Sequence, residues 1–208
     1  MRHAVLWTVN ILLLFVLEAA ARGQTPPNTL SAEEMQEGWI LLWDGKTLNG
    51  WESHGSGVWK VEDGALVGEP EGKAGWLGTM QAFSDFVLKA EFRTTADCNS
   101  GIYLRAAREG VPRQTGYEIQ IRDYKEPQET VPFLTGSLVM HAHASGAKII
   151  PNQWNRYEVT AQGDHFIVVY NGQTVLDTRQ SKTSSGVIGL EYNNRKIEFR
   201  NLKLRPLR

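Results

Sequence analysis

Short runs in which apolar and polar residues alternate, separated by turn sequences, occupy most of the chain after residue 39. Between residues 86 and 93 the apolar side chains fall at every second position, which is the period of a strand with one face in a core. The dipeptides Asp63-Gly64 and Asn171-Gly172 are typical of the tight turns that close β-hairpins. We expect strands at residues 40–43, 59–61, 65–67, 86–93, 102–106, 117–122, 137–140, 154–161, 165–170, 187–192 and 196–204. Because no helices connect them, the sequence predicts an all-β fold of antiparallel sheets, either a two-sheet sandwich, which we favour, or a closed barrel.

One short helix is expected near the N-terminus, because Ser31-Ala32-Glu33-Glu34 has the capping-box pattern and Gly38 can end a helix. A chain of 208 residues, with 41% hydrophobic and 22% charged residues, has the size and composition of a single globular domain. Its formal net charge of −1 gives no electrostatic reason to expect a nucleic acid as a partner.

Residues 1–23 have the features of a cleavable signal peptide. A basic segment at Arg2 and His3 precedes an apolar run, and small residues around Ala21 suit a signal peptidase. The run is shorter than the ~20 apolar residues that a membrane span needs, so an uncleaved anchor is the less favoured alternative. We therefore expect an exported protein, periplasmic or extracellular, without membrane contact after cleavage. A leader with the short helix would occupy residues 24–37, and the β domain residues 38–208.

The familiar motifs of serine hydrolases, zinc proteases and nucleotide-binding enzymes are absent from the sequence. Candidate site residues therefore have to be found as polar side chains on strand faces. Alternation places Asn99, Tyr103 and Arg105 opposite the apolar Ile102 and Leu104. A neighbouring Tyr and Arg could orient a sugar or stabilise an oxyanion, and the alternative is an ordinary exposed strand face.

A second polar face follows at residues 117–122, where Glu118, Gln120 and Arg122 point away from the apolar positions. Glycosidases on jelly-roll sandwiches carry the pattern E-x-D-x-x-E on such a strand. This chain keeps the spacing as Glu118-x-Gln120-x-x-Asp123, but an amide cannot share a proton with Glu118. The usual pair of a retaining glycosidase is therefore not expected, while Glu118 remains a candidate general base or metal ligand.

His141 and His143 would share one face of an extended segment and could bind a metal or transfer a proton. The alternative is a pair of polar loop histidines. Cys98 is the only cysteine, so thiolates cannot build a metal site. A divalent metal ion, if one is used, would be held by Glu118, His141 and His143.

Two tryptophans are candidate platforms on which a sugar ring could stack. Trp51 and Trp76 lie among glycines, whereas Trp43, Trp59 and Trp154 occupy strand patterns typical of core positions.

The order of these motifs is similar to that of a family of domains, formerly of unknown function, now associated with 3-keto-disaccharide (3-keto-glycoside) hydrolysis. The matching segments extend over nearly the whole chain after residue 37 and lie at residues 38–39, 42–51, 59–64, 85–86, 99–105, 117–120, 153–155, 171–172, 186–190 and 199–201. The resemblance implies a concanavalin A-like jelly-roll sandwich, export across an inner membrane and a sugar substrate. The segment at residues 137–147, with its two histidines, departs from the commoner family sequence.

The chemistry that the resemblance implies needs only one strong base. A ketone at C3 of a sugar acidifies the proton at C2, so a base can expel the C1 substituent by elimination before water adds. We expect Glu118 or His143 to be the base, with Arg105, or a divalent metal ion held by Glu118 and a histidine, stabilising the enolate. The expected substrate-binding residues are Asn99, Tyr103, Gln120, Trp51 and Trp76.

The same fold allows two other functions, so the enzyme hypothesis has competitors. A non-catalytic, lectin-like carbohydrate-binding module of the cell envelope would depend on stacking at Trp51 or Trp76 and not on Glu118. A structural or interaction domain of the envelope would respond to no sugar.

Overall fold

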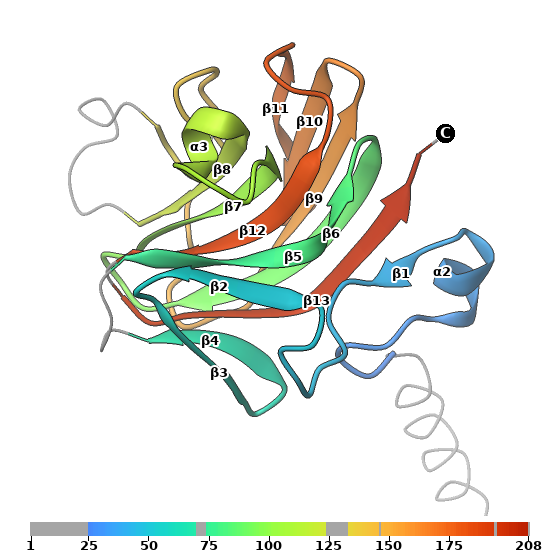
Figure 1. Cartoon of the computed structure of the whole chain (residues 1–208), viewed down its shortest axis with the longest axis vertical. Helices are drawn as coiled ribbons and strands as arrows, with labels where there is room; N and C mark the ends of the chain where they lie inside the picture. The colour runs from blue at the N-terminus through green and yellow to red at the C-terminus, as the bar shows by residue number, and fades with distance from the viewer. Residues whose placement is uncertain (1–24, 70–73, 124–132, 146, 194, 208) are drawn as a thin grey trace, which may run out of the picture.

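The computed structural model describes residues 25–69, 74–123, 133–145, 147–193 and 195–207. Its strands form two antiparallel sheets (Figure 1). The prediction of an all-β, two-sheet antiparallel sandwich is therefore confirmed. The larger sheet has the order β11 (Gln173–Arg179), β10 (His165–Tyr170), β9 (Asn155–Gln162), β6 (Phe86–Thr94), β13 (Ile197–Pro206), β4 (Ala65–Glu69) and β3 (Val58–Glu62), and β1 (Ile40–Leu41) also pairs with β13. The smaller sheet has the order β2 (Trp51–Gly55), β5 (Gly75–Phe83), β12 (Gly186–Tyr192), β7 (Asn99–Ala106) and β8 (Tyr117–Arg122).

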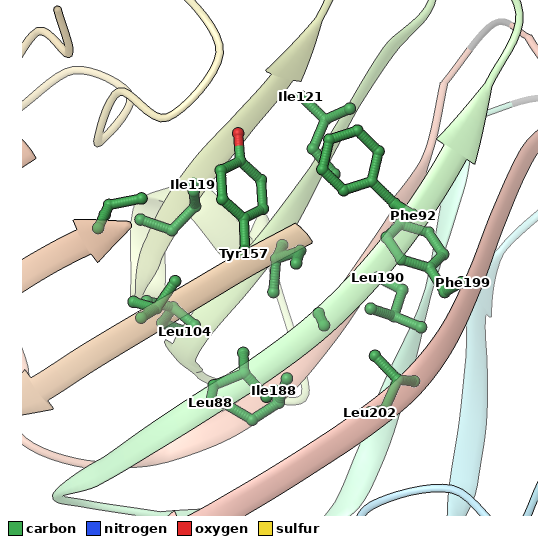
Figure 2. Packing of buried hydrophobic residues seen from close by; sticks show 14 of the residues in the cluster. Leu88, Phe92, Leu104, Ile119, Ile121, Tyr157, Ile188, Leu190, Phe199 and Leu202 are labelled. Atoms are coloured by element: carbon green, nitrogen blue, oxygen red, sulfur yellow. The ribbon is translucent and has the colours of Figure 1, made fainter. Parts of the chain in front are cut away.

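The hydrophobic core lies between the two sheets. Figure 2 shows side chains of both sheets in this space, among them Phe92 of β6, Ile119 of β8 and Leu190 of β12. The four apolar side chains at every second position of residues 86–92 are at most 1% exposed, as the period of two predicts. Full burial of a large apolar side chain is worth about 1.5–3 kcal/mol, so this pattern makes a large contribution to the stability of the sandwich.

Two hairpins turn where the dipeptides predict. Asp63 and Gly64 have φ angles of 49° and 70° between β3 and β4, and Asn171 and Gly172 have φ angles of 47° and 86° between β10 and β11. Positive φ at both central residues is the geometry of the type I′ turn, whose twist matches that of the strands.

The N-terminal helix, α2 (Ala32–Gln36), begins with the predicted capping box. The Ser31 side chain accepts a hydrogen bond from the Glu34 backbone N–H, and the Glu34 side chain accepts one from the Ser31 backbone. The leader before the helix packs on the domain, because Asn28 and Asn201 each donate a backbone N–H to the other's side-chain oxygen. The expected signal peptide at residues 1–23 lies outside the described residues. None of the helices in the described part of the chain is long and apolar enough to cross a membrane.

Two sequence expectations about strands are corrected. Residues 137–140 form no strand, and only Leu138 makes isolated bridges there, to Ile119 and Ala142. Conversely, β2 and β5 were not indicated by the sequence. β2 has three polar residues in succession after Trp51, and β5 begins Gly-Trp-Leu-Gly, so neither shows the regular alternation that marks the other strands.

Candidate functional site

One face of the smaller sheet carries a row of large polar and aromatic side chains. Strand pairing places His54 of β2 beside Trp76 of β5, and Trp76 beside Glu191 of β12. On the other side of β12, Tyr103 of β7 pairs with Glu118 of β8. The residues on either side of Tyr103 along β7 face the core. The row therefore lies on the face turned away from the larger sheet.

A groove of about 620 Å³ lies over this face. The loop at residues 108–112, leading into α3 (Pro112–Thr115), forms one wall, and Figure 1 shows α3 beside β7 and β8. Two contacts fix this wall: Arg108 donates to the Met80 backbone oxygen, and Lys182 donates to the backbone oxygens of Arg113 and Gly116 at 2.9 and 3.0 Å. The groove is lined on the sheet side by His54, Trp76, Tyr103 and Glu191.

Glycines make room for the large side chains of the groove. A Cβ atom at Gly189 would lie 2.7 Å from Cε3 of Trp76 and 3.0 Å from Cδ2 of Tyr103. A Cβ atom at Gly101 would lie 2.9 Å from Oε1 of Glu118. The aromatic rings and the Glu118 carboxyl therefore lie directly on backbone, and any larger residue at these two positions would displace them.

The aromatic side chains form a continuous stack across the sheet. The rings of His54 and Trp76 are parallel within 11°, with centroids 4.0 Å apart, and Trp76 meets Tyr103 edge-on at 6.0 Å. Trp76 also lies close against the backbone at Gly78 and Gly189, and only 7% of it is exposed. The stacking face expected of Trp76 is thus occupied by the His54 imidazole.

Two buried carboxyls lie beside the aromatic row. Glu118 is 3% exposed and Glu191 is 8% exposed. The Tyr103 hydroxyl donates a hydrogen bond of 2.8 Å to Oε1 of Glu191. The Oε2 atoms of both carboxyls have no hydrogen-bond partner among the described residues, which leaves them available to a proton or a ligand.

The surroundings of these carboxyls favour their protonated forms. Burial, with a further contribution from the negative charge of Glu191, raises the pKa of Glu118 to about 8, while Arg113 acts in the opposite sense. Burial also raises the pKa of Glu191, against the hydrogen bond from Tyr103 and the charge of Arg113. A carboxyl whose pKa lies near neutrality is well matched to proton transfer at that pH.

This shift predicts how stability changes with pH. The folded protein holds the Glu118 proton up to about pH 8, whereas the unfolded chain releases it near 4.5. The stabilisation is therefore complete below 4.5 and is lost as the pH rises towards 8. The glutamine of Glu118→Gln cannot ionise, so the variant avoids this loss. The difference in free energy of unfolding, variant minus wild type, should therefore increase by about 2–4 kcal/mol from about pH 5 to pH 9. Urea unfolding across this range measures the difference, and a constant difference would contradict the raised pKa.

Sequence comparison places this chain in a known family. The family model described as "3-keto-alpha-glucoside-1,2-lyase-like domain" matches residues 38–205. The chain belongs to this family. A protein of Bacteroides thetaiotaomicron named 3-keto-disaccharide hydrolase is 35% identical over 81 residues, which are 34% of this chain and 28% of that protein. The match thus spans less than a third of that relative's length.

Solved structures share the fold of this 3-keto-alpha-glucoside-1,2-lyase-like domain. A candidate glycosyl hydrolase from Parabacteroides distasonis superposes with a TM-score of 0.77 at 23% identity, over 88% of this chain and 100% of that one. The carbohydrate-binding module CBM66 from Bacillus subtilis gives a TM-score of 0.56 at 17% identity, over 74% and 94% of the two chains. The exoplasmic/lumenal domain of VIP36, bound to Ca²⁺ and Man3GlcNAc, gives 0.58 at 13% identity, over 83% and 90%. These likenesses concern the fold alone.

Within the lyase-like domain, some residues expected from the sequence come together. Asn99, Tyr103, Glu118 and Gln120 share the groove-facing side of β7 and β8. Gln120 is 5% exposed, and its Oε1 has no hydrogen-bond partner in the described part of the chain. Trp76 lies in the groove, two strands away from Tyr103.

The expectation that Arg105 faces the groove is wrong. Tyr103 pairs with Gly189 but Ala106 pairs with Val187, so β7 has one extra residue at a bulge. Arg105 adopts a φ of 52° there, and its fully buried side chain turns away from the groove. Its guanidinium donates to the backbone oxygens of Ser84, Gly163 and Thr183 and to the Asp85 carboxylate at 2.7, 2.7, 3.3 and 2.9 Å. It holds loops together at one end of the sandwich and cannot stabilise an enolate in the groove.

Trp51 and the two histidines are also placed elsewhere. Trp51 belongs to the core and donates to the Leu42 backbone oxygen, so it is no stacking platform. His141 packs on the core-facing ring of Tyr117, and the exposed His143 stacks on Phe133. Neither histidine lines the groove, and His141 packs on the side of β8 opposite Glu118. No group of three or more His, Cys, Asp or Glu in the described ranges could hold a metal. The expected metal set of Glu118, His141 and His143 and the role of His143 as base are therefore withdrawn.

Sequence reasoning missed two groove residues, Glu191 and His54, and the charged Arg113, which acts on both buried carboxyls. Glu191 had a signal, because alternation in β12 places it with Gly189 opposite the apolar Ile188 and Leu190. His54 and Arg113 had none. His54 lies on an edge strand with few apolar residues, and Arg113 lies in the short helix α3, which only the tertiary structure brings beside β7 and β8.

Proposed function

We propose that this protein is an exported carbohydrate-active enzyme that cleaves 3-keto-glycosides by base-assisted elimination and then hydration. Membership of the 3-keto-alpha-glucoside-1,2-lyase-like family supports the substrate class. The observation that carries the proposal is the buried Glu118 carboxyl, which lies beside the groove-lining Tyr103 and has one free oxygen and a pKa raised to about 8. Export rests on the signal-peptide features of residues 1–23.

The reaction uses the ketone to make one proton removable. In its ionised form, whose share grows as the pH approaches 8, the Glu118 carboxyl takes the proton from C2, and the electron pair forms an enolate at C2 and C3. The enolate collapses to a C1–C2 double bond as the C1–O bond breaks, and the leaving oxygen takes up the proton. Water then adds its hydroxyl to C1 and a proton to C2, which yields the free 3-keto-sugar. Because a single base suffices, an amide at Gln120 is compatible with this route.

A comparison of oxidised and unoxidised sugars tests the proposal. The purified protein is incubated with a 3-keto-glucoside, 3-keto-trehalose and the two parent sugars, with and without EDTA. We expect both keto-sugars to be consumed and the parent sugars to persist, because only the ketone acidifies C2. Loss of turnover with EDTA would add a metal ion to the reaction. No turnover, with thermal stabilisation by an unoxidised glycan, would make the protein a carbohydrate-binding module instead.

A further inference from the structure

We propose that Glu191 is the second catalytic group of this site. Glu191 and Glu118 hold a single proton between them, so that one carboxyl takes the C2 proton while the other donates a hydrogen bond to the C3 oxygen. The inference rests on the proposed function for its substrate. The shared proton itself concerns only the two side chains and can be tested without any substrate.

Strand register brings the two carboxyls to the same depression in the sheet. Leu190 pairs with Ile102, so the next residue of β12, Glu191, lies beside Gly101 of β7. Gly101 in turn pairs with Gln120 of β8, and the Glu118 carboxyl leans over it at 2.9 Å from the position of an added Cβ atom. The two carboxyls therefore approach the space above Gly101 from opposite sides.

The surroundings of the two carboxyls suit two acids that hold one proton. Tyr103 donates to Oε1 of Glu191 and favours its ionised form, while the two Oε2 atoms have no partner in the described structure. Two ionised carboxyls buried side by side would repel each other, and one shared proton removes that repulsion. Arg113 of α3 lowers the pKa of both carboxyls, so its positive charge favours the one negative charge that remains on the pair.

The elimination needs a base for the C2 proton and a hydrogen-bond donor to the C3 oxygen. The two carboxyls can supply both, whereas Arg105 turns away from the groove and cannot be the donor. The ionised carboxyl accepts the C2 proton, and the protonated one donates to the C3 oxygen as negative charge develops there. A neutral carboxylic acid in a dry site is an effective donor to an enolate oxygen. When the C1–O bond breaks, the leaving oxygen takes the proton from the carboxyl that received it. The pair then holds one proton again.

The carboxyl titration tests the shared proton directly. With ¹³C-labelled glutamate, NMR should show a carboxyl in wild type with an apparent pKa near 8. Its pKa should fall by at least about one unit in Glu191→Gln, because the neighbouring negative charge is gone. Tyr103→Phe keeps the ring and removes the hydrogen bond to Glu191, so it should raise the lower pKa of the pair. Glu158→Gln, on the larger sheet, is the control and should change neither. An unchanged carboxyl titration in Glu191→Gln would show that Glu118 and Glu191 do not share a proton.

The pH profile of turnover tests the catalytic role. A pair that needs one proton gives a bell-shaped kcat/KM, which falls above about pH 8 when both carboxyls ionise. Glu191→Gln should lower kcat by about 100-fold and move the alkaline limb. A wild-type rate that rises through pH 8 to a plateau would overturn the donor role, since Glu118 would then act alone. If wild type shows the shared titration but turns over no keto-sugar, the proposed reaction fails while the pair stands.

Discussion

Glu118→Gln is expected to lower kcat/KM on a 3-keto-glucoside by about 1,000-fold. The amide has nearly the shape of the carboxyl, so it should still fit over Gly101, but it cannot accept the C2 proton. Binding of the keto-sugar should change much less, because the aromatic row and the loop wall of the groove remain. Initial rates over a range of substrate concentrations separate kcat from KM and show which of the two falls.

The matched control for this loss is Glu158→Gln, which makes the same chemical change on β9 of the larger sheet. It should keep the wild-type rate. A Glu118→Gln protein that is folded and fully active would show that Glu118 does not handle the proton, and the proposed mechanism would then be wrong.

Arg105→Ala is expected to destabilise the fold by about 3–5 kcal/mol. The guanidinium is fully buried and donates to three backbone oxygens and to Asp85, so its removal takes a donor from each of them and leaves Asp85 without its cation. Losses of this size follow when one partner of a buried charged network is removed. Urea unfolding at neutral pH measures the change.

Arg156→Ala provides the comparison, because Arg156 lies exposed on β9. It should change the free energy of unfolding by less than about 0.5 kcal/mol. If Arg105→Ala were equally mild, the buried hydrogen bonds of Arg105 would contribute little. A role for Arg105 in holding the loops at residues 84–85, 163 and 183 would then fail.

Much of the fold could be predicted because its signals are local. Alternation identified β6, whose apolar side chains are all in the core, and the two type I′ hairpins formed at the dipeptides that suit them. Ser31 and Glu34 carry the whole signal of the helix cap. Local backbone preferences are strong in each case, and no partner distant in sequence is needed to satisfy them.

Part of the candidate site could be predicted by the same argument. Tyr103, Glu118 and Gln120 share a face because side chains alternate along a regular strand. The prediction failed at Arg105, where a bulge inserts one residue and reverses the side on which the next side chain lies. Nothing next to Arg105 in the sequence indicated that irregularity, because the bulge exists only in the pairing of β7 with β12.

The sequence by itself therefore determined the class of fold, the hairpins and the face of β8 that carries Glu118, since these depend on neighbours along one strand. Only the tertiary structure decided which carboxyl stands opposite Glu118 and which aromatic rings line the groove. Glu191 and Glu118 are separated by 73 positions along the chain, as their numbers show, and both approach Gly101 because β12 and β8 both pair with β7. The order of strands in a sheet depends on packing between distant segments, and no local pattern carries it.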